Sequence, residues 1–179
     1  DPLSYLLVRE LDEWASEAGH ADNAVTWHPF ELRPPPTPLV AIDDGSLASR
    51  WNEARSLAEE FGLTFAPPSL VPWTRKANEL VLLAQEHGKA HEARRRLFEA
   101  YLLEGLDIGR VDVLVDVALG LGLDRTETKA VLDVDRHLAD VAALREQAVN
   151  SGVTTTPTLV GGRERLGAFH HRDRLGTLP

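Results

Sequence analysis

An acid and a hydroxyl side chain lie three residues apart at the start of the chain, in the segment Asp1-Pro2-Leu3-Ser4. A carboxylate accepts hydrogen bonds and can act as a general base, and a serine hydroxyl both donates and accepts. Aspartate followed by proline is also a common helix start, because the acid caps free N–H groups and proline suits the first turn. The segment is therefore either an ordinary helix start or a functional site at a helix N-terminus.

The sequence contains no cysteine, which removes several kinds of chemistry at once. Disulfide exchange, thiolate nucleophiles and cysteine-bound metal clusters are all excluded for this chain. His87 and His91 have the spacing of a metal-binding pair on one helix. However, Gly88 lies between them where a helix is expected to end, and no third ligand follows at a fitting offset. We therefore expect no bound metal.

Composition limits the partners of the chain. Its 179 residues, of which 43% are apolar and 26% charged, suit one compact domain or a small domain with a large insertion. The net charge of -9 argues against binding to nucleic acid or to an anionic membrane. No apolar run reaches the length of a membrane span, and no signal-peptide pattern is present. We expect a cytoplasmic protein whose partner is a small-molecule substrate.

The elements that would position Asp1 and Ser4 follow from the hydrophobic pattern. Apolar residues recur at helical spacing from the start of the chain until Gly19, which predicts a first helix. Residues 24–27 (AVTW) predict a short strand, and residues 33–38 (RPPPTP) predict a stiff loop. A helical period then continues from Ser46 to about Asn150, interrupted by a proline-rich loop over residues 65–72.

Polar residues mark the expected helix starts in this long helical segment. A side-chain oxygen at the N-cap accepts a hydrogen bond from a free N–H of the first turn. The predicted caps are Ser46, Thr74, Asp112, Asp124 or Thr126, and Asp135.

The pattern changes to a β type near the end of the chain. Residues 154–160 and 165–168 predict two strands joined by the turn Gly161-Gly162, and residues 170–178 predict a last helix. Two strands are too few for a stable sheet. We therefore expect a first strand before Asp1 that is missing from this sequence.

Four segments, in this order and spacing, resemble one family. They are DPLSYL at residues 1–6, WHPFEL at 27–32, RLFEAY with GLDIG at 96–109, and GVTTTPTLV at 152–160. Together they resemble the DsbA-like thioredoxin-fold proteins, particularly the FrnE-like branch. The 2-hydroxychromene-2-carboxylate isomerases and the kappa-class glutathione transferases are relatives of this branch. The resemblance spans nearly the whole chain.

The resemblance implies an α/β architecture, a thioredoxin-like fold interrupted by an all-helical insertion. Residues 1–45 would form the first part of the core, residues 46–149 the insertion, and residues 150–179 the second part of the core. The active group would lie at the start of the first core helix, opposite a loop in which the Thr156-Pro157 bond is cis. Without the resemblance, Pro157 reads as an ordinary edge-strand or turn proline.

The sequence departs from the family at the expected active group. FrnE-like proteins carry Cys-X-X-Cys there, whereas the isomerase and transferase relatives carry Ser-Pro-X-Ser, whose first serine bonds the sulfur of glutathione. Ser4 matches the second serine, but Asp1 replaces the first. A carboxylate repels a thiolate, although it can bond a neutral thiol or act as a general base.

Two functional hypotheses follow, and a plain helical scaffold is a third. The first is an enzyme of the oxidoreductase and isomerase superfamily that acts on a small organic substrate with glutathione or another low-molecular-weight thiol as cofactor. Asp1 and Ser4 would be catalytic, and Thr156, Pro157 and Trp73 would bind the substrate or thiol, although Trp73 could equally serve packing. The second is a redox-inactive binding or chaperone-like module. The resemblance also implies a homodimer.

Overall fold

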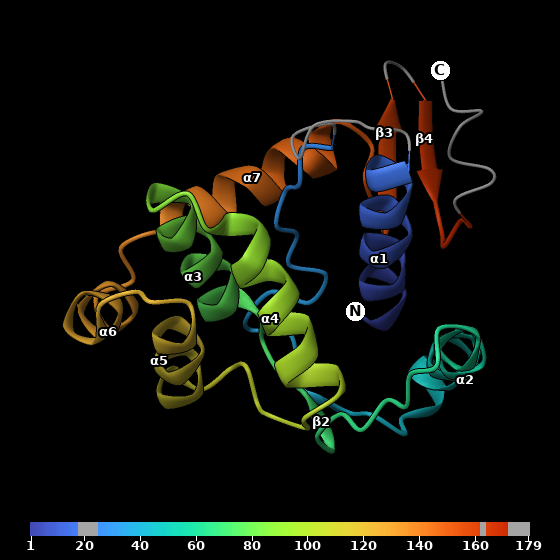
Figure 1. Ribbon diagram of the computed structural model, residues 1–179, viewed down its shortest axis with the longest axis horizontal. Coiled ribbons are helices and arrows are strands. Elements are labelled where there is room, and N and C mark those ends of the chain that lie inside the picture. Colours follow the sequence, from blue (N-terminus) through green and yellow to red (C-terminus); the bar gives the residue numbers. More distant parts are fainter. Residues whose placement is uncertain (18–24, 162–163, 172–179) are drawn as a thin grey trace.

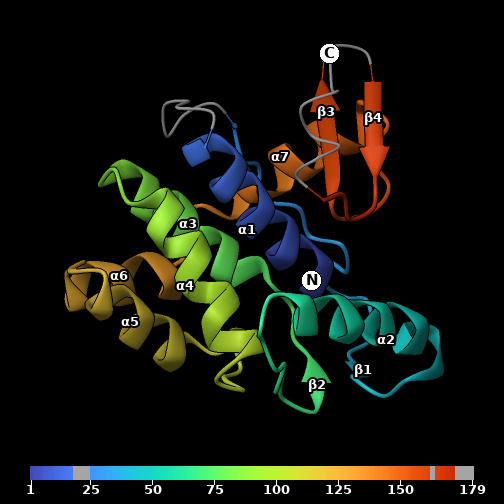
Figure 2. The same cartoon turned by 45° about the vertical axis from the view of Figure 1, so that its right-hand side comes forward.

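The computed structural model of the chain describes residues 1–17, 25–161 and 164–171. Helix α1 (Pro2–Glu17) lies between a group of helices and a β-hairpin, an arrangement that can be followed in two views (Figures 1 and 2). The helices are α1, α2 (Gly45–Glu60), α3 (Arg75–Glu86), α4 (Ala90–Leu102), α5 (Val111–Gly120), α6 (Arg125–Asp133) and α7 (Leu138–Asn150). The strands are β1 (Val40–Ala41), β2 (Leu70–Val71), β3 (Thr158–Gly161) and β4 (Glu164–Gly167).

Helix α1 packs its apolar residues against two separate clusters. Tyr5 and Leu6 join the main core formed with α2 to α6. Leu7 and Leu11 form a second cluster, into which Trp27 and the β3 residue Leu159 pack. The helix predicted from the first residues is thus confirmed, and its two apolar faces fix the start of α1 between the helices and the hairpin.

Helix α3 occupies the centre of the helical group, in contact with α4, α5, α6 and α7. Its side chains Leu80, Leu83 and Ala84 are fully buried. Glu79 is buried with them, where its carboxylate accepts a hydrogen bond from the His137 N–H. The apolar residues at helical spacing in this segment therefore belong to α3, a helix that is surrounded by other helices.

Three predicted helix caps are wrong and two others are correct in position. Asp124 accepts a hydrogen bond from the Glu127 N–H and caps α6, and Thr74 occupies the N-cap position of α3. Ser46 does not cap α2; the carboxylate of Asp44 does so, because it accepts from both the N–H and the hydroxyl of Ser46. Asp112 lies in the first turn of α5 instead of at its cap.

Asp135 is also not a cap, because α7 begins three residues later, at Leu138, with His137 in the N-cap position. Asp135 adopts a positive φ of 54° and binds Lys76 of α3 instead. Short polar residues tolerate this left-handed conformation better than most others do. A capping residue and a turn residue share the same amino acid types, so the sequence pattern alone does not separate them.

Replacing Asp124 by alanine should destabilise the chain by about 1 kcal/mol, because the Glu127 N–H would lose its capping acceptor. Thr126→Ala is a matched control, since Thr126 is exposed within α6 and was the alternative cap. Urea unfolding followed by circular dichroism measures both effects. An equal loss of stability in the two variants would contradict the assignment of Asp124 as the cap.

The predicted C-terminal hairpin is confirmed, with a shorter first strand and with the second strand shifted by one residue. β3 and β4 are antiparallel and place Leu159 opposite Leu166. The strand begins at Thr158 instead of residue 154, because Pro157 has no N–H to donate to a ladder. The Thr156–Pro157 bond is cis, as the resemblance implied.

Other strand predictions differ from the structure. Residue 24 lies outside the described residues, and residues 25–27 are not in a strand, because the described part of the chain offers them no hydrogen-bonded neighbour. The short ladder that pairs Val40 with Val71 was not predicted, because its two-residue strands carry no periodic signal. The last predicted helix falls mainly on residues 172–178, outside the described residues.

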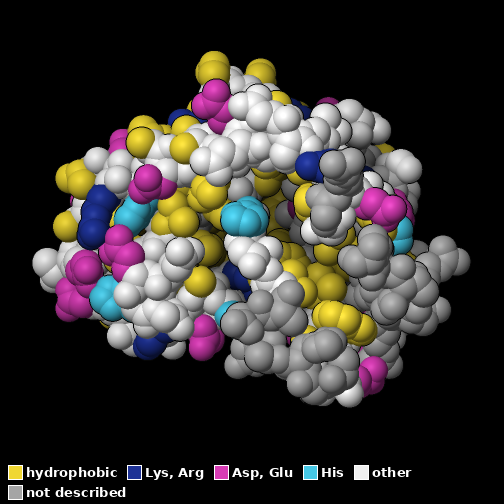
Figure 3. Space-filling view, turned by 90° about the horizontal axis from the view of Figure 1, so that it is seen from above, with side chains coloured by type: hydrophobic (Ala, Val, Ile, Leu, Met, Phe, Trp, Pro, Cys, Tyr) yellow, Lys and Arg dark blue, Asp and Glu magenta, His cyan; other side chains and the backbone are white. Residues whose placement is uncertain are grey.

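The surface agrees with the acidic composition. In the described part of the chain, no helix is long and apolar enough to cross a bilayer. On the face in Figure 3, acidic and basic side chains of the described residues are scattered, and the basic ones form no continuous stripe.

Candidate functional site

The first turn of α1 is closed by its own acid and hydroxyl. The Ser4 N–H donates to Oδ2 of Asp1 at 3.0 Å, and the Ser4 hydroxyl donates to the same oxygen at 2.5 Å. The Tyr5 N–H also donates to the Asp1 carbonyl at 3.3 Å. Asp1 therefore caps the helix, and in doing so it holds the Ser4 hydroxyl in one orientation.

Arg50 of α2 connects this helix start to the cis-proline loop. Its Nε donates to Oδ1 of Asp1 at 2.7 Å, and its Nη2 donates to the carbonyl oxygen of Thr156. A longer contact of 3.5 Å joins Nη2 to the Thr156 hydroxyl. Figure 2 shows α2 passing the start of α1, which is where the guanidinium makes these bonds. One side chain thus bridges residues that are 49 and 106 positions away in the sequence.

The Asp1–Arg50 pair is partly sheltered from water, with side chains that are 12% and 27% exposed. Burial lowers the pKa of the Arg50 guanidinium, and the neighbouring carboxylate of Glu53 acts in the opposite direction. An arginine side chain nevertheless stays protonated in proteins. Both oxygens of Asp1 accept hydrogen bonds, so the charge of Asp1 is balanced by Arg50 and fixed in place.

The cis-proline loop is held from the hairpin side. Pro157 is buried and Thr156 is half-buried. The Thr158 hydroxyl donates to the Thr155 carbonyl at 2.7 Å, and the Ala168 N–H donates to the Pro157 carbonyl at 3.2 Å. Arg50 on one side and the hairpin on the other therefore determine where the Thr156 carbonyl lies relative to α1.

The structure joins Asp1, Ser4 and Thr156 at one site, with Pro157 next in the chain. Trp73 is placed elsewhere: its indole Nε1–H donates to the Thr37 carbonyl at 2.9 Å, and the side chain is 40% exposed. The hydrogen bonds of the described residues do not connect it to the other site residues. A thiol- or substrate-binding role for Trp73 stays a prediction.

Sequence reasoning missed Arg50, which is the residue that assembles the site. No local signal identifies it, because it lies on a helix whose other exposed positions are also charged or polar. Its neighbour Trp51 is buried in the main core. Packing of Trp51 in the core orients α2 so that the preceding side chain, Arg50, reaches Asp1 and Thr156.

The histidine pair considered as a metal site is divided between two helices. His87 is the C-cap of α3 and lies 3.3 Å from Glu127, whereas His91 belongs to α4 and lies 3.7 Å from Asp12. Among the described residues, no group of three or more histidine, aspartate or glutamate side chains is arranged to hold a metal ion.

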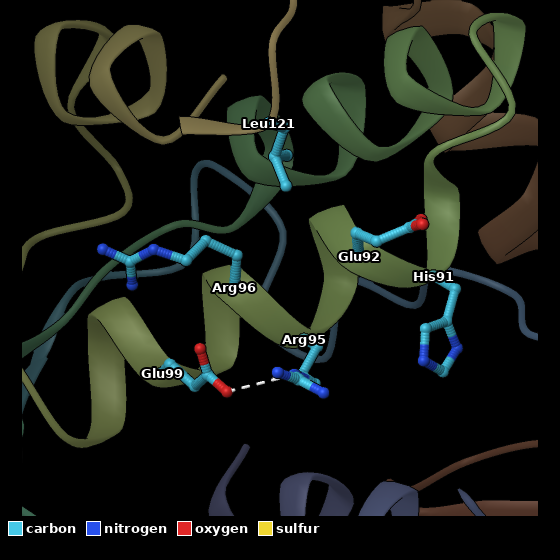
Figure 4. A pocket seen from close by; sticks show the side chains of 6 residues that line it. All are labelled: His91, Glu92, Arg95, Arg96, Glu99 and Leu121. Atoms are coloured by element: carbon cyan, nitrogen blue, oxygen red, sulfur yellow. Dashed lines mark ion pairs between the residues drawn. The ribbon is translucent and has the colours of Figure 1, made fainter. Parts of the chain in front are cut away.

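A shallow pocket lies on the exposed face of α4 (Figure 4). Arg95 and Glu99 pair within it at 3.2 Å, and Arg96 pairs with Glu104 at 2.8 Å. Its remaining lining residues are His91, Glu92 and Leu121. Because acids and bases in the lining largely balance each other, the pocket carries no clear preference for a charged ligand.

A helix start held against a cis-proline loop, with a helical segment inserted between them in the sequence, defines a thioredoxin-like protein of the DsbA type. Here an acid and a hydroxyl occupy the helix start, and the chain has no cysteine. The chain belongs to the DsbA-like thioredoxin domain family, whose model matches residues 2–178.

Known proteins are similar to this chain in sequence or in structure. Protein YwbO of Bacillus subtilis (strain 168) is 35% identical over 147 residues, which cover 79% of this chain and 73% of YwbO. The structure of the probable DsbA oxidoreductase SCO1869 from Streptomyces coelicolor is similar with a TM-score of 0.81 and 19% identity, covering 99% of this chain and 83% of that one. A 2-hydroxychromene-2-carboxylate isomerase has a TM-score of 0.78 and 19% identity, covering 99% and 87%. At this identity the two structures establish the shared fold.

Proposed function

We propose that this DsbA-family chain is a thiol-dependent isomerase or transferase that acts on a small organic substrate. Glutathione or another low-molecular-weight thiol would bind at the site formed by Asp1, Ser4, Arg50 and Thr156. Disulfide exchange is not part of the proposal, because the chain has no cysteine.

The fixed Ser4 hydroxyl at the start of α1 is the observation that carries this proposal. Its donor is used by Asp1, so the lone pairs of its oxygen remain to accept a hydrogen bond from a ligand. The Thr156 N–H donates to no described residue, and Arg50 has an Nη1 group without a described partner. The site therefore combines an acceptor at α1 with donors at α2 and the loop, which suits a thiol that also carries carbonyl or carboxylate groups.

The fold is compatible with this chemistry, since an isomerase is among the proteins that share it. Isomerisation leaves the overall oxidation state of a substrate unchanged, so it needs no cysteine pair. Within this family we place the chain in the FrnE-like branch. A cytoplasmic location would supply glutathione-type thiols in their reduced form.

A redox-inactive binding or chaperone-like module is the second candidate. It is favoured by one feature of the site: Asp1, Ser4 and Arg50 satisfy one another without any ligand. In that reading the three residues only hold α1, α2 and the cis-proline loop together.

Titration with glutathione, followed by calorimetry or tryptophan fluorescence, tests the proposed function. We expect saturable binding that Ser4→Ala weakens about three- to tenfold, the equivalent of one lost hydrogen bond. Ser56→Ala is the matched control, since Ser56 is an exposed serine on α2 away from the site. No binding of glutathione or of other cellular thiols would favour the binding module instead.

A further inference from the structure

The hydrogen bonds at the start of α1 determine which form of a thiol fits there. A serine hydroxyl has a single proton, and at Ser4 that proton points to Oδ2 of Asp1 at 2.5 Å. The Ser4 N–H points to the same oxygen. A ligand atom beside Ser4 therefore meets acceptors: the remaining lone pairs of the Ser4 oxygen and the carboxylate of Asp1.

Arg50 holds the Asp1 carboxylate in the orientation in which it accepts the Ser4 hydrogen bonds. Its Nε binds Oδ1, which leaves Oδ2 as the oxygen that receives both Ser4 donors. Since Arg50 also donates to Thr156, the guanidinium that holds the Asp1 carboxylate is itself held from the cis-proline loop. The orientation of the Ser4 hydroxyl thus depends on a chain of contacts from Thr156 through Arg50 and Asp1.

The charges around the start of α1 also disfavour a thiolate beside Ser4. Asp1 and Glu53 each carry one negative charge near the single positive charge of Arg50. A thiolate placed beside Ser4 would add a further negative charge next to a carboxylate, and like charges at short range raise the pKa of the group that is added. No other charged group of the described residues contacts Asp1 or Arg50 through an ion pair.

We propose that this site takes its thiol ligand in the protonated S–H form, with Ser4 Oγ or Asp1 as the hydrogen-bond acceptor. The thiol group of the ligand thus acts as a neutral hydrogen-bond donor and is not a thiolate. This inference rests on the proposed thiol-dependent function and states which form of the ligand that function uses.

The pH dependence of glutathione binding tests the inference. Carboxyl groups ordinarily titrate well below pH 6.5 and guanidinium groups well above pH 9.5, so the experiment follows the titration of the ligand's thiol between these two pH values. A cysteine-type thiol titrates near pH 8.5, so its neutral fraction falls about tenfold between pH 6.5 and 9.5. Calorimetric titration should show the affinity of the wild-type chain for glutathione falling by about the same factor.

S-methylglutathione is the control ligand, because it keeps the amine and carboxylates of glutathione but has no S–H. S-methylglutathione should bind more weakly than glutathione at pH 6.5. Between pH 6.5 and 9.5 its affinity should not show the fall that titration of the thiol causes for glutathione. This comparison uses the unaltered chain, so it does not depend on how any variant folds.

Asp1→Asn provides the complementary test. Removing the carboxylate charge leaves Arg50 free to pair with a thiolate, so affinity for glutathione should rise with pH in this variant. Asp43→Asn is the matched control, since Asp43 is an exposed acid in the loop before α2 and should keep the wild-type profile.

The outcomes separate this inference from the function on which it rests. Absence of glutathione binding at every pH would overturn both the thiol-dependent function and the inference. Binding that strengthens as pH rises in the wild-type chain, or equal binding of both ligands, would overturn the inference while the thiol-dependent function stands.

Discussion

Replacing both Asp1 and Ser4 by cysteine is expected to convert the chain into a disulfide oxidoreductase. The two positions have the Cys-X-X-Cys spacing: Asp1 caps α1, and Ser4 lies in its first turn. A helix N-terminus stabilises a thiolate through its free N–H groups and its dipole. The fold and the cis-proline loop are already present, so the variant adds only the reactive sulfur atoms.

Arg50 should increase the reactivity of the new thiol at position 1. In the Asp1→Cys, Ser4→Cys variant, the guanidinium loses its carboxylate partner and is left beside the sulfur. A neighbouring arginine and a helix N-terminus lower cysteine pKa values from about 8.5 to about 3.5–7.5. At pH 7 the thiolate fraction would rise from about 3% to about a quarter or more, roughly eightfold or more.

Insulin reduction in the presence of dithiothreitol measures the gain in activity, and ultraviolet absorbance of the thiolate measures its pKa. The single variants Asp1→Cys and Ser4→Cys are the controls, because one thiol cannot close an intramolecular disulfide. Adding Arg50→Gln to the double variant should return the thiol pKa toward its ordinary value. A double variant that is no more reactive than the single variants would show that this helix start and Arg50 do not stabilise a thiolate.

Leu80→Ala is expected to cause a large loss of stability. Leu80 is 0% exposed on α3, the helix in contact with α4, α5, α6 and α7. Removing a fully buried leucine side chain leaves a cavity and costs about 2–5 kcal/mol. Because domains of this size are stable by only about 5–15 kcal/mol, this loss is a large fraction of the total.

Urea unfolding should show a midpoint that is lower by about 1–2 M in the Leu80→Ala variant. Val134→Ala is the control, since Val134 is 71% exposed and its truncation should change the midpoint little. Similar midpoints for the two variants would mean that α3 is not the centre of the core. The glutathione titration of a folded Leu80→Ala sample further separates stability from binding, because Leu80 is absent from the Asp1 site.

Much of the secondary structure could be predicted because its causes are local. The apolar spacing of Leu3, Leu7 and Leu11 specifies a helix, and the β-prone segments around Gly161-Gly162 specify a hairpin. Exact helix starts were less predictable. Asp44 and Ser46 are both good caps, and only the path of the backbone into α2 decides that Asp44 accepts the hydrogen bonds.

Long-range pairing explains the predictions that were wrong or missing. The β-prone residues 25–27 form no strand, because a strand requires a partner and the described structure places none beside them. The two-residue strands β1 and β2 exist only because two loops approach each other, with Val40 opposite Val71. Neither outcome is encoded in the residues of one segment.

The sequence by itself determined that this protein cannot exchange disulfides, since it has no cysteine, and that an acid and a hydroxyl stand at a helix start. It also carried the family resemblance that the cis bond before Pro157 confirmed. The tertiary structure alone decided that Arg50 joins Asp1 to Thr156, while Trp73 bonds to a different loop. The physical reason is distance along the chain: hydrogen bonds between residues 49 and 106 positions apart depend on how α2 packs, and no local pattern records that packing.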